Sequence, residues 1–411
     1  MISERISKVK LILFLYFFYS VSYIFIPANI PTTYICLFIL LLYFVFYTAK
    51  IKSIKITNGA AFIFSFLFLF VSVISYLINK NDADLFMVRT ASMYLIMTII
   101  IHSLVVGLFK KDFILLFKTI GYIAVINGFM ILAMFLVKPF QSAYLMLISD
   151  KAFNLIGGTG ALSGFMSLRM IGINGFSAYA TGFLQCLCGM CYCYYMFLRD
   201  TKIILKLRDY IVLGIIILSA LISARSSLVG ITFILAILFI NMNFFKFWKS
   251  ILFVALMVIS MLILVIFLTP PSMKEFFVTW VTEFFVSGAE TGSLQTNINM
   301  YVYTLSDFNL IGDSRWYGDI NSSNYYMGTD VGWYRLAFSV GFIGATVWLL
   351  TLVSFFRLKN ILSLSLKFET IFSKFLFLYI IIVMFKGAIL FDSFQSVLIL
   401  LIVDCANKYR T

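Results

Sequence analysis

One polar stretch combines an arginine, carboxylates and aromatic rings. Residues 309–319 read NLIGDSRWYGD, residues 324–326 read NYY, and an apolar run begins just after Asp330. Arginine grips phosphate oxygens with a planar fork of N–H donors. Tyrosine and tryptophan offer a ring to stack on and a polar tip to hydrogen-bond with. The stretch therefore predicts a site that holds a phosphate and a sugar.

The charge balance of the longer stretch 269–330 indicates which kind of sugar the site would bind. From 269 to 330 it has two basic and seven acidic residues. An acidic, aromatic-rich surface favours neutral or aminated sugars. The predicted sugar-binding residues are Asp313, Trp316, Tyr317, Tyr325 and Tyr326.

The composition of the rest of the chain is typical of an integral membrane protein. The 411 residues are 63% hydrophobic and only 12% charged, about half the charged fraction of soluble domains. A chain with so few charged residues could not cover the surface of a water-soluble protein. We expect an all-α, polytopic helical bundle forming a single integral membrane domain over residues 1–411, with the lipid bilayer as its partner.

Apolar runs of about 20 residues predict the spans. About twelve are expected, near 11–27, 32–48, 58–78, 88–109, 113–137, 177–197, 209–224, 226–242, 250–268, 332–356, 371–388 and 393–406.

Basic residues predict the orientation. The formal net charge of +14 is spread in short clusters between apolar segments, which indicates membrane topology and not nucleic-acid binding. With the N-terminus inside, 21 of the 31 Lys and Arg residues fall in inner segments, most of them Lys. Both termini are then cytoplasmic. One medium loop (138–176) and one large loop (269–331) are extracytoplasmic.

The outer basic residues differ from the inner ones. Five of the ten are arginines, each near an outer boundary: Arg89, Arg169, Arg225, Arg315 and Arg335. As a group they predict phosphate binding around one outward-facing cavity. Interfacial snorkelling and structural ion pairs with acids such as Asp392 are the alternatives.

The cysteine cluster and the single histidine could suggest a metal site, but neither supports one. The cysteines at 186, 188, 191 and 193 lie in an apolar helix, where successive positions point in different directions, so they are expected to be core residues. His102 is the only histidine and is expected to pack within its helix. We predict no metal site and no cofactor.

Three segments in order resemble the Wzy-type O-antigen and capsular polysaccharide polymerases and the related O-antigen ligases. These are 218–230 with Ser226 after Arg225, the loop around 307–313, and 329–344 at the entry to the next span. The match covers roughly the last 240 residues. Its specificity lies in the order of the segments on about twelve spans with one large outer loop.

The resemblance implies a reaction and a site. Such polymerases join repeat units carried on undecaprenyl pyrophosphate at the outer face of the bacterial cytoplasmic membrane, in O-antigen (lipopolysaccharide) or capsule biosynthesis. The growing chain leaves its lipid carrier for the next unit. We expect Arg225, Arg169, Arg335 and Arg89 to bind the pyrophosphate, and Arg315 and Asp330 to be catalytic, with Asp330 as base. A flippase and a chain-length regulator of the same pathway are the implied protein partners.

Alternative functions remain open. A lipid-linked oligosaccharide flippase also has about twelve spans, but generally short loops. Ligases of this superfamily carry a histidine where this chain has Thr329 or Asp330, which favours polymerase over ligase. A solute transporter would show paired repeats or broken helices in matching halves, and neither is evident in the sequence.

Overall fold

The protein is helical. The computed structural model describes residues 7–148, 171–173, 178–200, 205–242, 244–268, 295, 298–318, 325–365 and 367–410. The main helices are α1 (Lys8–Phe18), α2 (Thr32–Ile51), α3 (Gly59–Ile78), α4 (Phe86–His102), α5 (Phe113–Leu136), α6 (Lys138–Leu145), α9 (Ala178–Asp200), α10 (Leu207–Ser223), α11 (Ser227–Asn241), α12 (Phe244–Leu268), α15 (Gly332–Phe356), α16 (Leu358–Leu362), α17 (Phe368–Val383), α18 (Ile389–Asp392) and α19 (Val397–Arg410). A π-helical segment, Ser103–Leu108, extends α4.

Six helices in the described part of the chain are long and apolar enough to cross a membrane. They are Thr32–Ile51, Gly59–Ile78, Phe86–Leu108, Phe113–Leu136, Tyr179–Asp200 and Gly332–Phe356. The predicted helical membrane bundle is thereby confirmed. A helix overlaps each of the twelve predicted ranges, although several of these helices are shorter than a bilayer requires.

The predicted first span differs most from the structure. Only Lys8–Phe18 is helical, which is about 16 Å of helix against roughly 30 Å of hydrocarbon. The hydroxyls of Thr32 and Thr33 donate to the carbonyls of Tyr16 and Phe17 at 3.0 and 2.8 Å. These two bonds satisfy carbonyls at the end of α1, so the helix stops where a propensity pattern alone would continue it.

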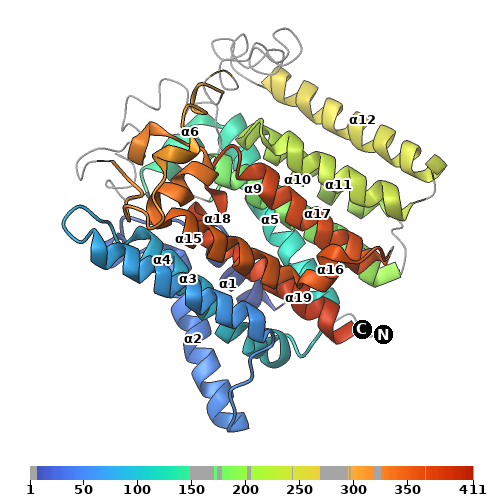
Figure 1. Ribbon diagram of the computed structural model, residues 1–411. Helices are drawn as coiled ribbons and strands as arrows, with labels where there is room; N and C mark the ends of the chain where they lie inside the picture. The colour runs from blue at the N-terminus through green and yellow to red at the C-terminus, as the bar shows by residue number, and fades with distance from the viewer. Residues whose placement is uncertain are drawn as a thin grey trace. The chain divides into compact units, whose positions relative to one another are not determined.

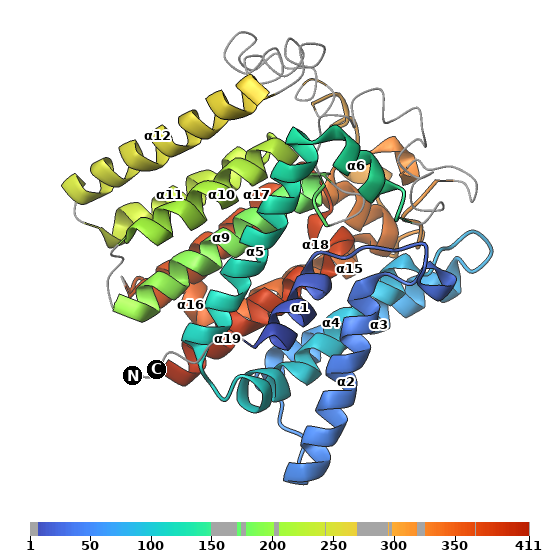
Figure 2. The ribbon, with the colours of Figure 1, turned by 180° about the vertical axis from the view of Figure 1, so that it is seen from behind.

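The helices pack into two compact units, each built from two separate stretches of chain. One contains 1–40 and 112–286, and the other contains 41–111 and 287–411. In the first, α5, α9 and α10 pack against one another (Figure 2). The cysteines of α9 are free thiols buried in this core, as predicted.

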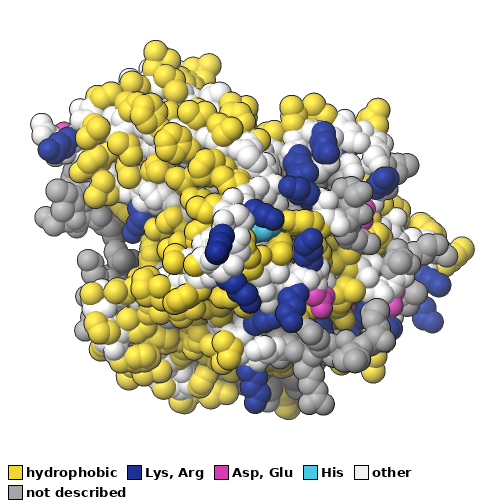
Figure 3. Space-filling view, turned by 90° about the horizontal axis from the view of Figure 1, so that it is seen from below, with side chains coloured by type: hydrophobic (Ala, Val, Ile, Leu, Met, Phe, Trp, Pro, Cys, Tyr) yellow, Lys and Arg dark blue, Asp and Glu magenta, His cyan; other side chains and the backbone are white. Residues whose placement is uncertain are grey.

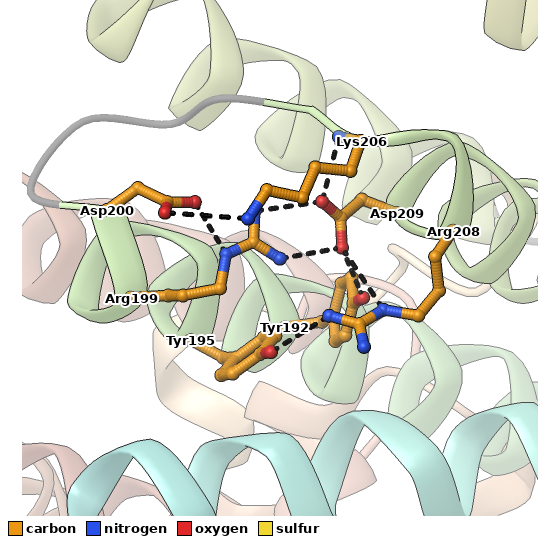
Figure 4. Close-up of polar contacts among 7 residues, drawn as sticks. All are labelled: Tyr192, Tyr195, Arg199, Asp200, Lys206, Arg208 and Asp209. Carbon is orange, nitrogen blue, oxygen red and sulfur yellow. Dashed lines mark hydrogen bonds and ion pairs between the residues drawn. The ribbon is translucent and has the colours of Figure 1, made fainter. Parts of the chain in front are cut away.

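A buried ion cluster closes one end of this first unit (Figure 4). Arg199, at the end of α9, donates to both carboxylate oxygens of Asp209, at 3.1 and 2.9 Å. Asp209 is fully buried and also accepts from the Tyr192 hydroxyl at 2.7 Å and the Lys206 amide at 2.9 Å. The carboxylate is therefore surrounded by donors, which burial of a charge requires.

In the second unit, α3 packs along α15 and α4, and α19 packs beside α4 and α15 (Figure 1). Segments nearly 300 residues apart in the chain thus share one core. Small side chains allow the close approach, because Ser65, Ser72 and Ser75 of α3 are all buried. Tyr94 of α4 reaches the Leu390 carbonyl at 2.9 Å.

The second unit has one strongly basic end. Lys111 lies over the ring of Tyr409 at 4.6 Å, and Lys408 donates to the Thr57 carbonyl at 2.8 Å. Lys55, Lys111 and Lys408 lie near His102, the cyan side chain among dark blue ones in Figure 3. The segments around 79–85, 309–318, 325–331 and 384–396 lie at the opposite ends of the same helices.

Candidate functional site

The site of interest rests on a break in α15. Gly341 has φ +70° and ψ −177° inside this span, so the helical hydrogen-bond ladder is interrupted there. Segment 309–314 fills the gap. The amides of Asp313 and Ser314 donate to the carbonyls of Phe338 and Ser339 at 2.7 and 2.9 Å.

The same segment satisfies the other side of the break. The amides of Phe342 and Ile343 donate to the carbonyls of Asn309 and Leu310 at 3.1 and 3.2 Å. An unpaired backbone group in an apolar interior costs several kcal/mol, on the order of 2–7. The break explains why the sequence NLIGDS is fixed in place, and it is a broken span that the sequence did not reveal.

The turn between α3 and α4 holds this segment from the other side. Ser75 and Asn79 both donate to the Gly312 carbonyl, each at 2.8 Å. Asp84 accepts from the amides of Trp316 and Tyr317 at 2.6 and 3.2 Å. These contacts set the direction of the chain through residues 312–317.

Trp316 is thereby placed against Arg335. The guanidinium carbon of Arg335 lies 3.9 Å from the centroid of the Trp316 ring and 3.6 Å from that of Tyr325. The other face of Trp316 stacks on Phe86 at 4.5 Å. The indole is fully buried, so it supports Arg335, and this position does not suit the stacking on a sugar that the sequence predicted for Trp316.

One edge of the Arg335 guanidinium has two buried donors that could bind an anion. The side chain is only 2% exposed, and its Nη1 lies 3.5 Å from Oδ2 of Asp392. Nε and Nη2 are buried and have no hydrogen-bond partner among the residues that the structure describes. Aromatic rings cover both faces of the group, and these two nitrogens form the edge that binds two oxygens of one anion in parallel.

Two carboxylates accompany this edge. Burial raises the pKa of Asp330, although the positive charges of Arg335 and Lys386 oppose the rise. Burial also raises the pKa of Asp392; Arg335 and the Trp316 indole N–H oppose this, and the charge of Asp330 adds to it. A carboxylate with a raised pKa is a stronger base, which suits removal of a proton from a sugar hydroxyl.

Arg315 lies in a different place. Its guanidinium carbon is 4.8 Å from the centroid of the Tyr326 ring, and its Nη2 donates to the Gly318 carbonyl at 3.3 Å. Tyr326 in turn donates to Asp313 at 3.1 Å. These three predicted residues line a cleft of about 320 Å³.

The structure brings only part of the predicted arginine ring together. Arg89 is exposed and lies 5.0 Å over the ring of Phe86, near the Trp316 stack. Arg225, in the turn between α10 and α11, belongs to the other compact unit. Arg169 lies outside the described residues, so its predicted role stays a prediction.

Sequence reasoning missed the residues that position the site. Asp84 and Asn79 sit in a short polar connection between two spans, a pattern typical of ordinary turns. Asp392 was considered among the charges that could surround the outward-facing cavity or form ion pairs, and it was given no role in the site. Its isolation as a carboxylate within the apolar run 387–403 was the available indication.

Comparisons with known proteins do not identify a family for this chain. No protein-family model, no curated protein and no solved structure matches the chain.

Proposed function

We propose that this protein is a membrane glycosyltransferase that polymerises lipid-pyrophosphate-linked oligosaccharide units. The proposal rests on the buried edge of the Arg335 guanidinium. Aromatic rings cover both faces of this group, and its Nε and Nη2 donors are oriented to bind one oxyanion. A diphosphate leaving group presents such paired oxygens, and fixed donors aimed at developing charge are the main catalytic device in group transfer.

The residues divide the reaction between them. Arg335 binds the diphosphate and stabilises the negative charge that grows on the oxygen leaving the anomeric carbon. Asp330 takes the proton of the acceptor hydroxyl. The oxygen of that hydroxyl forms a bond to the anomeric carbon, the bond from this carbon to the diphosphate oxygen breaks, and the lipid diphosphate departs. Asp392 holds Arg335 in place through Nη1.

The charge distribution supports the proposed orientation. The basic end of the second unit carries Lys55, Lys111 and Lys408, and the Arg335 site lies at the opposite helix ends. Positively charged loops stay on the cytoplasmic side. In a bacterial cytoplasmic membrane this orientation puts the C-terminus inside and the site outside, where undecaprenyl-linked units of O-antigen or capsule are exposed.

Deletion of the gene tests the proposal directly. Gel analysis of surface polysaccharide should show single repeat units attached and the ladder of longer chains lost, with recovery by the wild-type gene. Complete loss of attached units would instead indicate a flippase or a ligase. An unchanged ladder would refute the proposal.

Substitution of Arg335 ties the phenotype to the site. Arg335→Ala should fail to restore the ladder at a protein level equal to that of the wild type. Arg→Ala at Arg225 then asks whether the other unit contributes, as the sequence predicts. Restoration of the full ladder by Arg335→Ala would remove the basis of the proposal.

A further inference from the structure

A polar cleft lies beside the Arg335 site, and its lining does not include Arg335, Trp316, Tyr325, Asp330 or Asp392. It has a volume of about 320 Å³ and is lined by Ile78, Asn79, Asn81, Asp82, Asp313, Arg315 and Tyr326. Its residues come from the α3–α4 turn and from the loop before α15. The volume is within the range of small-ligand sites, about 300–1,000 Å³.

One wall of the cleft is rigidly set. Asp313 accepts from the Asn309 amide at 3.3 Å through one oxygen and from the Tyr326 hydroxyl at 3.1 Å through the other. Its backbone amide is bonded into the α15 break. Asn79 donates both to Ser75 and to Gly312. This wall is therefore pre-organised and does not need ordering when a ligand binds.

Asn81 and Asp82 also line the cleft, and we call them its rim. Both side chains are exposed, and neither makes a hydrogen bond to another described residue. The Asp82 charge is close enough to raise the pKa of Tyr326, after the larger effects of burial and of Asp313. The rim thus offers an amide and a carboxylate to a ligand, in addition to the already fixed wall.

We propose that this cleft binds one sugar ring of the glycan, either neutral or carrying an amino group. The proposal deepens the polymerase function and rests on it. Carboxylate and amide side chains hydrogen-bond vicinal hydroxyls, and an ammonium group would pair with Asp82 or Asp313. The α3–α4 turn thereby becomes part of the substrate site, a role that the sequence did not suggest for it.

Other ligand classes fit the lining less well. A phosphate or a uronic acid would face two carboxylates, Asp82 and Asp313, against the single guanidinium of Arg315. A divalent cation would share the cleft with the Arg315 guanidinium and compete with the donors that already hold Asp313. No cluster of three or more His, Cys, Asp or Glu side chains suited to a metal occurs in the described part of the chain.

Direct binding tests the cleft. Purified full-length protein in nanodiscs is mixed with methyl glucoside, glucosamine or glucuronic acid, and saturation-transfer NMR reports contact with each. The first two should give signals and glucuronic acid should not. The double variant Asn81→Ala/Asp82→Ala should weaken binding about tenfold, as expected for two lost hydrogen bonds. Lys80→Ala, in the same turn and outside the cleft lining, is the matched control.

The outcomes separate the cleft from the polymerase proposal. Absence of saturation transfer to every sugar in the wild type, unchanged binding in the double variant, or a preference for glucuronic acid would overturn the sugar cleft. Because both substituted side chains are exposed, thermal unfolding of the variant should match the wild type. If sugar binding behaves as expected while deletion of the gene leaves the ladder intact, the cleft stands and the polymerase function falls.

Discussion

Gly312 and Gly341 meet backbone to backbone at the break in α15. A β-carbon on Gly312 would stand 2.4 Å from the amide nitrogen of Gly341, and one on Gly341 would stand 2.3 Å from the Leu310 carbonyl. Such distances are shorter than any tolerated contact. The two positions, 29 residues apart, therefore form one joint between the loop and the membrane span.

Alanine at either glycine should loosen this joint. Gly312→Ala and Gly341→Ala are each expected to cost about 1–3 kcal/mol from overpacking, and Gly341→Ala adds strain because its φ is +70°. Thermal unfolding of detergent-purified protein measures the loss. Gly59→Ala is the control, since nothing lies within 4 Å of a β-carbon there. Equal stability of all three variants would contradict the close backbone contact between Gly312 and Gly341.

Lysine should not replace Arg335. Arg335→Lys keeps the charge but loses the planar fork and the stacking between Trp316 and Tyr325. We expect the polysaccharide ladder to be lost at normal protein level. Arg89→Lys should keep it, because Arg89 is exposed and lies over a phenylalanine ring that an ammonium group can also occupy. A full ladder with Arg335→Lys would show that charge alone suffices there.

Asp84 should matter as a positioning residue. Its carboxylate accepts three backbone amides, those of Phe86, Trp316 and Tyr317. Asp84→Ala leaves these donors unpaired, and chain-length analysis should show a shortened or absent ladder. Asp307→Ala is the comparison, because Asp307 is exposed and bonds only within its own turn at Thr304. Similar ladders in the two variants would argue against the positioning role.

The pH dependence of polymerisation should report Asp330. As the base, Asp330 acts ionised, so the rate should rise with pH through a pKa that burial holds above the usual aspartate value. Lys386 lowers that pKa, so Lys386→Met should raise it and move the acidic limb to higher pH. Rates are measured with purified protein and lipid-linked units, with Lys359→Met at the other end of the unit as control. A limb that moves to lower pH would exclude Asp330 as the titrating group.

The ion cluster at the end of α9 should be important for stability and not for chemistry. Asp209→Asn leaves Arg199 without its buried partner, which typically costs about 3–5 kcal/mol. Lys206→Ala should cost at most about 1 kcal/mol, because the Lys206 side chain is 57% exposed and its contact with Asp209 is through the backbone amide. Unfolding midpoints in detergent distinguish the two. A similar midpoint for both variants would mean that the pair adds little.

The sequence predicted the positions of the helices better than the construction of the site. Hydropathy located α3, α5 and α15 to within two residues, because lipid-facing and buried positions in a membrane are both apolar. Arg335 was found because a charge one turn inside a span is conspicuous. The break at Gly341 was not found, because glycine is common in membrane helices and the apolar run continues through it. The grouping of Arg335 with Trp316, Tyr325 and Asp392 depends on tertiary contacts that spacing does not encode.

The break in α15 also bears on how the protein is made. Segment 309–314, which completes the interrupted ladder, and the Ser75 and Asn79 side chains that hold this segment all precede Gly341 in the chain. A ribosome releases all of them before the second half of the span appears. The discontinuous helix therefore never has to wait in the lipid for a later partner. Moving the 309–314 segment behind α15 by circular permutation would reverse that order and expose the unpaired backbone during insertion.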